Sequence, residues 1–137
     1  MAQRRKLTKA ERQNVYDKMG GRCAYCGEEI TLGAMQVDHI IPIDMYDAYK
    51  TIGQDLNDMK NLLPACRNCN HYKHTLTVEK FREIVERGPE ILARVSTAYC
   101  MAVRFGTVKP NPKKVVFFFE RVAQGDGIPK NERVEFG

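Results

Sequence analysis

Two CxxC pairs, Cys23-Ala-Tyr-Cys26 and Cys66-Arg-Asn-Cys69, constrain the fold of this chain more than any other feature of its sequence. A single pair would also suit a redox site, but two pairs in turn-rich surroundings are better explained by one tetrahedral zinc site with four thiolate ligands. Such an ion has no open position for a substrate, and its role is to join two distant segments around a small core. We therefore predict a structural zinc ion bound by Cys23, Cys26, Cys66 and Cys69.

The length of 137 residues fits one domain, and the formal charge of +5 is concentrated near the N-terminus. In the first dozen residues a single acid, Glu11, stands against several cations. A basic arm of this kind either contacts a polyanion such as nucleic acid or is a solvated tail, and charge alone does not choose between the two. The cations are Arg4, Arg5, Lys6, Lys9 and Arg12.

No stretch of the sequence approaches the eighteen or so apolar residues of a membrane span. The basic N-terminus is also not followed by the apolar core of a signal peptide. We therefore expect a cytoplasmic protein, whose reducing surroundings argue against a disulfide framework. The fifth cysteine, Cys100, lies in an apolar stretch and is expected to be a buried small hydrophobe.

Capping residues and hydrophobic periodicity predict a mixture of helices and short strands. Thr8 and Glu11 form a capping-box pattern at the start of a helix. The apolar residues of 89–105 recur at three- and four-residue steps, which predicts a helix that packs this stripe into a core. Residues 115–119, Val-Val-Phe-Phe-Phe, have the composition of a strand. The expected elements are a helix over 8–19, a hairpin-like segment over 29–37, a strand over 37–41, a loop over 44–60, an extended segment over 61–65, a short helix over 70–74, helices over 78–87 and 89–105, and a strand over 115–119.

Acidic, amide and imidazole side chains around the cysteine pairs suggest a second metal site with a different role. Asp38 offers a hard anionic ligand and Asn70 a neutral carbonyl oxygen, a pair that suits Mg²⁺ or Mn²⁺. On a helix, Asn70 and His74 share a face because they are four residues apart, and a histidine ligand would also allow nickel, cobalt or zinc. Strict strand alternation places Asp38 and His39 on opposite faces, so both reach one phosphate only where the strand twists, bulges or ends.

The order and spacing of these motifs resemble those of the zinc-stapled HNH endonucleases. The resemblance implies the ββα-metal (His-Me finger) nuclease fold, here in an HNN variant because an asparagine occupies the last position. Residues 77–123 resemble, more weakly, the C-terminal extension of some bacterial and phage members. The motifs that carry the resemblance are Cys23-x2-Cys26, Asp38-His39-Ile40-Ile41-Pro42, Asn61-Leu62-Leu63 and Cys66-x2-Cys69-Asn70-x2-Lys73.

The resemblance implies a role for each matching residue. His39 would be the general base that takes a proton from the attacking water, and Asn61 would brace the loop between the strands and thereby orient His39. Asp38 and Asn70 would hold one divalent metal, Mg²⁺, Mn²⁺ or Ni²⁺, with His74 as a further ligand. The products would be 5′-phosphate and 3′-hydroxyl ends, as in the family.

These observations predict a metal-dependent endonuclease that hydrolyses phosphodiester bonds in DNA, in a bacterial cell or a phage-infected host. A histidine near its ordinary pKa can act as the general base, and a metal ion can stabilise the negative charge that accumulates on the leaving oxygen. Double-strand cleavage from one active site would require a homodimer or two sequential nicks, and a protein partner that directs cleavage is compatible with the same sequence. The expected phosphate contacts are Arg4, Arg5, Lys6 and Lys73.

Two other functions fit parts of the same pattern. One is a catalytically inactive zinc-stapled module that binds DNA or protein, and the other is a small zinc-ribbon adaptor. The presence together of Asp38, His39 and Asn61 argues against both, because a binding module has no use for that trio.

The expected fold class is α+β, with a small ββα-metal nuclease core stapled by a zinc ion on four cysteines, flanking helices and a C-terminal strand. The expected organisation is a basic arm and N-terminal helix over 1–20, the nuclease core over 21–76, an extension of the same domain over 77–123, and a flexible tail over 124–137.

Overall fold

The computed structural model describes residues 6–45 and 55–126 of the chain. Arg4, Arg5 and most of the expected tail therefore lie outside the described residues. The chain divides into two compact units, one made of residues 1–78 and 116–137 and the other of residues 79–115. The extension expected over 77–123 thus includes parts of both units.

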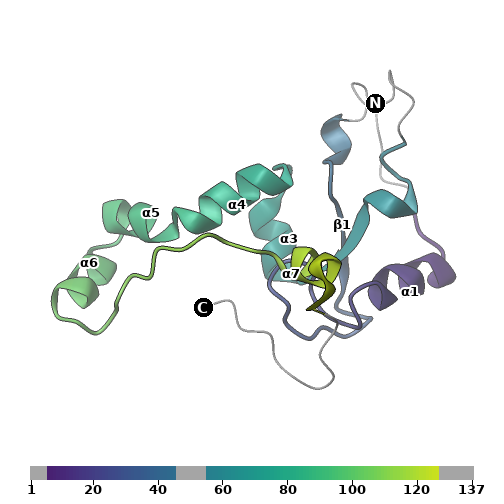
Figure 1. Ribbon diagram of the computed structural model, residues 1–137. Helices are drawn as coiled ribbons and strands as arrows, with labels where there is room; N and C mark the ends of the chain where they lie inside the picture. The colour runs from purple at the N-terminus through teal and green to yellow at the C-terminus, as the bar shows by residue number, and fades with distance from the viewer. Residues whose placement is uncertain (1–5, 46–54, 127–137) are drawn as a thin grey trace. The chain divides into compact units, whose positions relative to one another are not determined.

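The first unit begins with helix α1, Lys9–Asp17 (Figure 1). This helix has the predicted capping box. The Glu11 backbone N–H donates to the Thr8 hydroxyl at 3.1 Å, and the Thr8 backbone N–H donates to the Glu11 carboxylate at 3.0 Å. These bonds satisfy two donors near the start of the helix. The buried cluster against which α1 packs comprises Val15, Met35 and Leu62.

Two glycines end α1 slightly earlier than expected. Gly20 and Gly21 have φ angles of 62° and 81°, in the left-handed region that favours glycine. A Cβ atom at Gly21 would also lie 2.8 Å from the hydroxyl of Tyr16, which donates a hydrogen bond to the Ile30 carbonyl at 2.7 Å. Both the backbone conformation and this close approach therefore require glycine at position 21.

The centre of the first unit is a two-stranded antiparallel sheet followed by a helix. Strand β1, Gln36–His39, pairs with strand β2, Leu62–Ala65, and His39 lies opposite Leu62. The chain then enters helix α3, Arg67–Lys73, which contacts β1. This ββα arrangement within a helix-bearing unit is the α+β core that the sequence predicts. Two short 3-10 turns flank the long connection between the strands, η1 at Ile43–Met45 and η2 at Met59–Asn61.

The hairpin-like pattern expected over 29–37 was wrong for most of its length. Among the described residues of this segment, Glu29 forms only an isolated bridge with Arg22 before β1 begins. Thr31 organises a local turn instead, since its carbonyl accepts from Met35 N–H at 3.0 Å and its hydroxyl accepts from Ala34 N–H at 3.1 Å. Such side-chain and turn bonds compete with the formation of a strand.

The second unit is helical. Helix α4, Val78–Glu86, leads into α5, Gly88–Val95, and α6, Thr97–Arg104. The single helix expected over 89–105 is broken at Ser96, which has extended backbone angles and whose hydroxyl accepts from Tyr99 N–H at 3.1 Å as the cap of α6.

This break changes the environment of the apolar stripe. The prediction that the stripe packs into a core was wrong, because no residue of α5 or α6 is buried. Val95 and Phe105 are both 74% exposed. Cys100 is only partly buried, so it is not the fully buried small hydrophobe that was expected.

The strand expected over residues 115–119 is also absent, because Phe118–Arg121 forms helix α7 in the first unit. Phe118 N–H donates to the Tyr25 carbonyl at 3.1 Å, and Phe119 N–H donates to the Ala24 carbonyl at 2.7 Å. The rings of Phe117 and Phe119 meet Tyr25 edge-on, with centroids 5.2 and 5.8 Å away. Contact with the first cysteine turn thus overrides the local strand propensity of this segment.

No helix in the described parts of the chain is both long enough and apolar enough to cross a membrane.

Candidate metal centre and catalytic residues

The four cysteines of the two CxxC pairs converge on one point in the first unit. The sulfur atoms of Cys23, Cys26, Cys66 and Cys69 all lie within 4.8 Å of one another. The Sγ atoms of Cys26 and Cys66, which come from different pairs, are 3.9 Å apart. This is the donor set of a closed structural zinc site, so the four thiols form a group that can hold a metal ion such as zinc.

Backbone hydrogen bonds shape both cysteine turns. In the first, Gly27 has a φ of 78° and donates to the Cys23 carbonyl at 3.0 Å. In the second, Cys66 is the N-cap of α3, and its sulfur accepts from Cys69 N–H at 3.3 Å. Ala24 N–H donates to the Pro64 carbonyl at 2.8 Å and so ties the first turn to β2. The turns are therefore positioned by the protein backbone as well as by any bound ion.

The clustered thiols differ strongly in pKa, because the ionisation of one affects the others. Hydrogen bonds from Cys26 and Cys69 lower the pKa of Cys23 to about 2, and the bond to Cys23 raises the pKa of Cys69 well above its ordinary value. A thiolate at Cys23 thus makes its neighbour harder to ionise. A divalent cation is the partner that would allow all four sulfurs to bind as thiolates.

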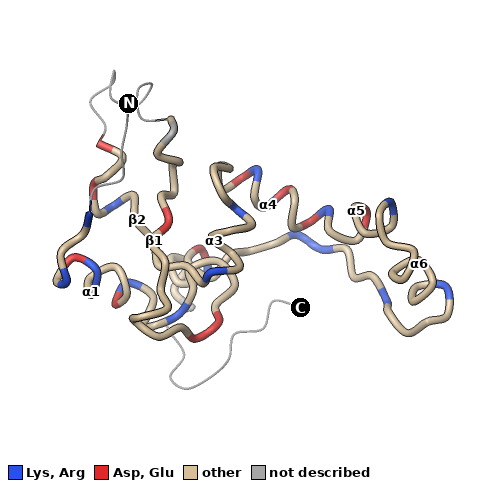
Figure 2. The backbone as a smooth tube through the Cα atoms, turned by 180° about the vertical axis from the view of Figure 1, so that it is seen from behind, with Lys and Arg blue, Asp and Glu red and all other residues tan. Residues whose placement is uncertain are grey.

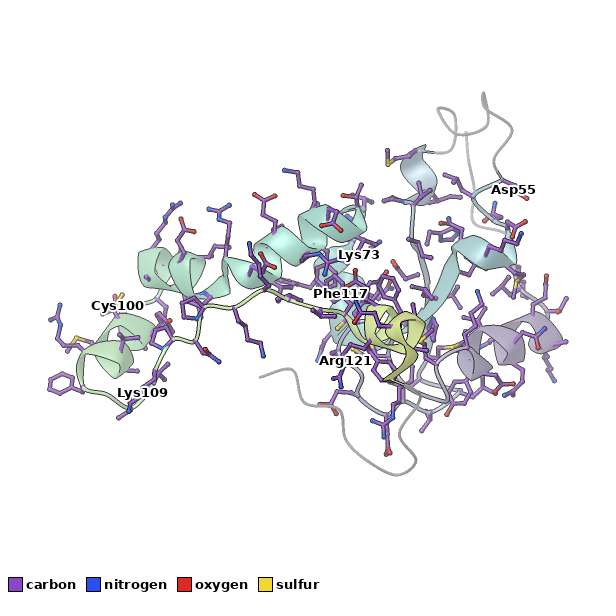
Figure 3. All side chains as sticks on the ribbon, viewed as in Figure 1. Asp55, Lys73, Cys100, Lys109, Phe117 and Arg121 are labelled. Carbon is purple, nitrogen blue, oxygen red and sulfur yellow. The ribbon has the colours of Figure 1, made fainter. Side chains whose placement is uncertain are left out.

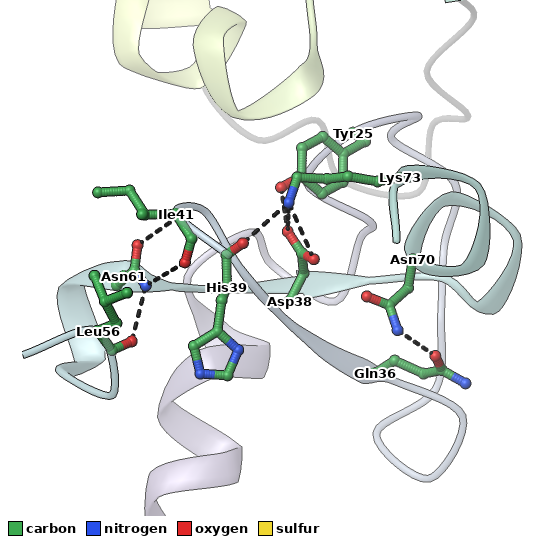
Figure 4. A network of polar contacts seen from close by, with 9 residues as sticks. All are labelled: Tyr25, Gln36, Asp38, His39, Ile41, Leu56, Asn61, Asn70 and Lys73. Atoms are coloured by element: carbon green, nitrogen blue, oxygen red, sulfur yellow. Dashed lines mark hydrogen bonds and ion pairs between the residues drawn. The ribbon is translucent and has the colours of Figure 1, made fainter. Parts of the chain in front are cut away.

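Asp38 lies in the interior beside this centre, between the first cysteine turn and α3. Its carboxylate accepts a hydrogen bond from the Tyr25 hydroxyl at 2.5 Å and pairs with the Lys73 ammonium at 3.0 Å (Figure 4). Lys73 also donates to the carbonyl of His39 at 3.0 Å. Asp38 therefore links three segments: the cysteine turn through Tyr25, α3 through Lys73, and its own strand.

The burial of Lys73 corrects its expected role as a phosphate contact. The Lys73 side chain is 0% exposed, and its charge is balanced by Asp38, which is 3% exposed. A buried lysine held by a carboxylate and a carbonyl is not available to a polyanion at the surface. Lys73 belongs to the internal network of the unit.

His39 lies on the other side of β1 from Asp38. Figure 4 shows the His39 ring and the Asp38 carboxylate pointing in opposite directions, as strand alternation requires. β1 ends at His39 without a bulge. The Nε2 atom of His39 lies 3.1 Å from Oδ1 of Asn57, and because an amide oxygen only accepts, the ring donates in this bond.

A pocket of about 320 Å³ borders the histidine. Lys6 and Arg12 line this pocket with His39, and Arg12 is held in place by its bonds to the carbonyls of Leu32, at 2.9 Å, and Met35, at 2.5 Å. The histidine thus faces a cavity with two basic groups on its wall. The remaining lining residues are Leu7, Val37, Asn57 and Leu62.

Asn61 joins the two ends of the long connection between the strands. Its Oδ1 accepts from Ile41 N–H at 2.9 Å, and its Nδ2 donates to the carbonyls of Ile41, at 3.1 Å, and Leu56, at 2.8 Å. The Asn61 carbonyl also accepts from Ile40 N–H at 2.9 Å. These bonds hold the chain just after His39, which is the geometry that a bracing residue needs.

Comparison with known proteins agrees with this geometry. A family model described as HNH endonuclease matches residues 23–76. These residues form an HNH domain. The match extends from the first cysteine pair past α3, so it includes the sheet, both cysteine turns and the histidine at the end of β1.

A search of solved structures found similarity to the Type II-C Cas9 enzyme from Actinomyces naeslundii. The two proteins share 24% sequence identity with a TM-score of 0.45, over 59% of this chain and 9% of that chain. The similarity therefore concerns a small part of a much longer protein. A search of curated proteins found no match.

The HNH domain also carries the residues expected to hold a catalytic metal. Asn70 donates from Nδ2 to Gln36 Oε1 at 2.6 Å, which leaves its own amide oxygen turned toward Asp38 (Figure 4). The two hard oxygen donors have the chemistry that Mg²⁺ or Mn²⁺ requires. His74 follows α3 with a φ of 49° and is exposed. Both oxygens of Asp38 are engaged by Lys73 and Tyr25, so an ion there would have to replace part of this network.

Sequence reasoning missed two residues of this site. Tyr25 was treated only as a spacer within the first CxxC, yet it is buried and bonded to Asp38. Asn57 was part of a loop without a clean period, and nothing in the local pattern distinguishes it from a turn residue. An aromatic residue between two metal-binding cysteines was the available signal for Tyr25, since a small zinc-stapled unit has few other apolar side chains to bury.

Proposed function

We propose that the HNH domain hydrolyses phosphodiester bonds in DNA, with His39 as the general base. The observation that carries this proposal is the position of His39 at the end of β1, where its ring borders a pocket lined by Lys6 and Arg12. A base beside fixed positive charge is the arrangement that attack of water on a phosphate requires. The membership of this segment in the HNH family supports the same reading.

The bond to Asn57 gives His39 a defined tautomer. Because Nε2 donates to Asn57 Oδ1, the lone pair that can accept a proton resides on Nδ1. Nδ1 is buried in this structure, so proton transfer requires a local opening that admits water to this atom. As a proton arrives on Nδ1, the bond to the Asn57 oxygen stabilises the positive charge that develops on the ring. Asn57 is therefore a positioning residue, and His39 is the residue that takes the proton from water.

Asn61 acts one step further from the reaction. Its side chain holds the Ile41 backbone in both directions, and Ile41 lies two residues after His39. Fixing this backbone limits the orientations open to the end of β1, which keeps the histidine near the geometry needed for attack. Lys6, which is exposed beside the pocket, would contact a phosphate of the bound strand.

Asp38 and Asn70 would hold a divalent ion, with His74 as a further ligand. When bound, such an ion would stabilise the negative charge on the leaving oxygen. Products with 5′-phosphate and 3′-hydroxyl ends are expected from water attack in this family.

A second candidate is a zinc-stapled module that binds DNA without cleaving it. The observation in its favour is the buried pair of Asp38 with Lys73, which already neutralises the expected metal ligand. A protein that had lost cleavage could retain this pair as a purely structural link. The two candidates differ in whether metal supports turnover.

Incubation of supercoiled plasmid with the zinc-loaded protein and Mg²⁺, Mn²⁺ or Ni²⁺ separates the two functions. We expect nicked or linear product that depends on the metal and is lost in His39→Ala. His71→Ala is the matched control, since His71 is an exposed histidine on α3, and it should retain cleavage. Salt-dependent DNA binding without cleavage under any metal would instead support the binding module.

A further inference from the structure

Residues 109–114 form an extended, exposed segment of the second unit, which we call the basic strap. Its sequence is Lys-Pro-Asn-Pro-Lys-Lys, and all six residues are exposed. The two prolines fix an extended backbone and remove two N–H donors, so the strap is neither helix nor strand. In Figure 1 it is part of the long stretch without regular structure that follows α6.

Both ends of the basic strap are anchored within the second unit. On its N-terminal side, the N–H groups of Thr107 and Val108 donate to the Ala102 carbonyl of α6 at 2.9 and 3.2 Å. On its C-terminal side, Val115 N–H donates to the Glu86 carboxylate at 2.9 Å, and the Val115 carbonyl accepts from Arg82 at 2.7 Å. The strap is thus an ordered span between two fixed points, so binding through it costs less ordering entropy than binding through a loose tail.

The charge balance of the second unit leaves this span positive. Residues 79–115 contain eight lysines and arginines but only four glutamates, and no acid occurs from residue 91 to residue 119. All four glutamates lie on α4 and α5, where each has a partner. Figure 2 shows red segments along α4 and α5 and only blue ones along the strap. The glutamates and their partners are Glu79 with Arg82, Glu83 with Lys80, Glu86 with the Val115 N–H, and Glu90 with Arg87 and Arg94.

The spacing of the lysines matches a phosphate backbone. At a rise of about 3.1 Å per residue, the five steps from Lys109 to Lys114 cover roughly 15 Å. One DNA strand carries a phosphate about every 3.4 Å along the helix axis, so this length spans roughly four phosphates. Lysine contacts of this kind bind the backbone without reading sequence. Figure 3 labels Lys109 at the α6 end of the strap.

We propose that the basic strap binds the phosphate backbone of DNA through Lys109, Lys113 and Lys114. This inference rests on the proposed function, because it assigns a second phosphate-binding surface for the same substrate. The strap supplies sequence-independent affinity, and the HNH domain supplies the chemistry. The strap is distinct from the N-terminal arm, to which the sequence had assigned most of the excess charge.

The test compares two triple variants with the same change in charge, both in zinc-loaded His39→Ala protein with no added Mg²⁺ or Mn²⁺. The strap variant carries Lys109→Gln, Lys113→Gln and Lys114→Gln. The control variant carries Lys80→Gln, Arg87→Gln and Arg94→Gln, all on α4 and α5. Binding to a short labelled DNA duplex is measured by fluorescence anisotropy between about 50 and 200 mM KCl, and log Kd is plotted against log salt.

We expect the strap variant to lower the magnitude of the salt slope by about 2 to 3, because each lost phosphate contact contributes about 0.9. The control variant should change the slope by less than about 1. Equal slopes in the two variants, or a strap variant that retains the parent slope, would overturn the proposal. Circular dichroism should show the same helix content in both variants.

Failure of this proposal can be told apart from failure of the proposed function. Plasmid cleavage by the protein with His39 intact tests the nuclease, whereas the salt slope is measured without turnover. Metal-dependent cleavage together with equal salt slopes in both variants would reject DNA binding by the basic strap and support the proposed nuclease activity. A salt slope that is lowered only in the strap variant, together with no cleavage under any metal, would support DNA binding by the strap and reject the proposed nuclease activity.

Discussion

The substitution Lys73→Met tests the internal network on which the HNH domain is built. Lys73 makes contacts of 3.0 and 3.3 Å with the two Asp38 oxygens and one of 3.0 Å with the His39 carbonyl. Methionine is similar in length but leaves Asp38 as a buried carboxylate whose remaining partner in this network is the Tyr25 hydroxyl. Removing one member of a buried ion pair costs about 3–5 kcal/mol, because the other charge stays desolvated.

That cost is large against the total stability of a chain of this size. Domains unfold with about 5–15 kcal/mol, so Lys73→Met should remove roughly a fifth or more of the folding free energy. For a chain of this length the melting temperature should fall by roughly 10–20 °C. The measurement is thermal and urea unfolding of zinc-loaded protein, followed by circular dichroism at a fixed concentration of free zinc.

Lys80→Met is the matched control for this prediction. Lys80 pairs with Glu83 at 3.2 Å on α4, but the two side chains are 67% and 50% exposed. Surface pairs contribute about 0–1 kcal/mol, so this variant should unfold almost as the parent does. Combining Lys73→Met with Asp38→Asn removes the stranded charge and should recover part of the loss. If Lys73→Met cost no more than Lys80→Met, the buried pair would not have the structural role assigned here.

Three further outcomes are expected. Chelation of zinc, or Cys66→Ser, should unfold the first unit, as seen by loss of tertiary circular dichroism, because the thiol cluster joins its two turns; retention of the native signal in metal-free protein would contradict this. Burial and the nearby Asp38 carboxylate raise the pKa of Tyr25 above the ordinary 10.0, so its contribution to stability is fully present below pH 10 and is lost as pH rises further. An absorbance titration should therefore find one phenol that ionises only on alkaline unfolding and is missing in Tyr25→Phe, and a normal titration of all phenols would refute the burial argument. Asn61→Ala should lower kcat by about 10- to 100-fold with DNA affinity unchanged, because it loosens the chain after His39 without touching phosphate; a change in affinity alone would place Asn61 at the DNA surface instead.

Local patterns predicted the elements whose determinants lie close together in sequence. The capping box of Thr8 and Glu11 gave the start of α1, because both partners lie within one helical turn. The four cysteines could be grouped from spacing alone, since zinc chemistry relates residues that are distant in the chain. Strand alternation likewise anticipated that Asp38 and His39 would face opposite sides of β1.

Predictions failed where a distant contact decided the outcome. Residues 115–119 have strand composition, but Phe118 and Phe119 donate to carbonyls of the first cysteine turn and begin a helix there. A lysine on a short helix is usually exposed to solvent, and nothing in the sequence next to Lys73 indicates otherwise. Lys73 is buried because it pairs with Asp38, which is far away in the chain. No window of local sequence contains either partner.

The sequence by itself determined the four-cysteine set that can hold a metal ion, the order of the motifs and the types of side chain in the candidate site. These follow from the identity and spacing of side chains, which do not depend on how the chain folds around them. Only the tertiary structure decided which of those side chains are free to meet a substrate. It buried Lys73 against Asp38, paired His39 with Asn57 from the long connection, and anchored the basic strap at both ends. Burial and pairing depend on contacts between segments far apart in the chain, and a local pattern carries no record of them.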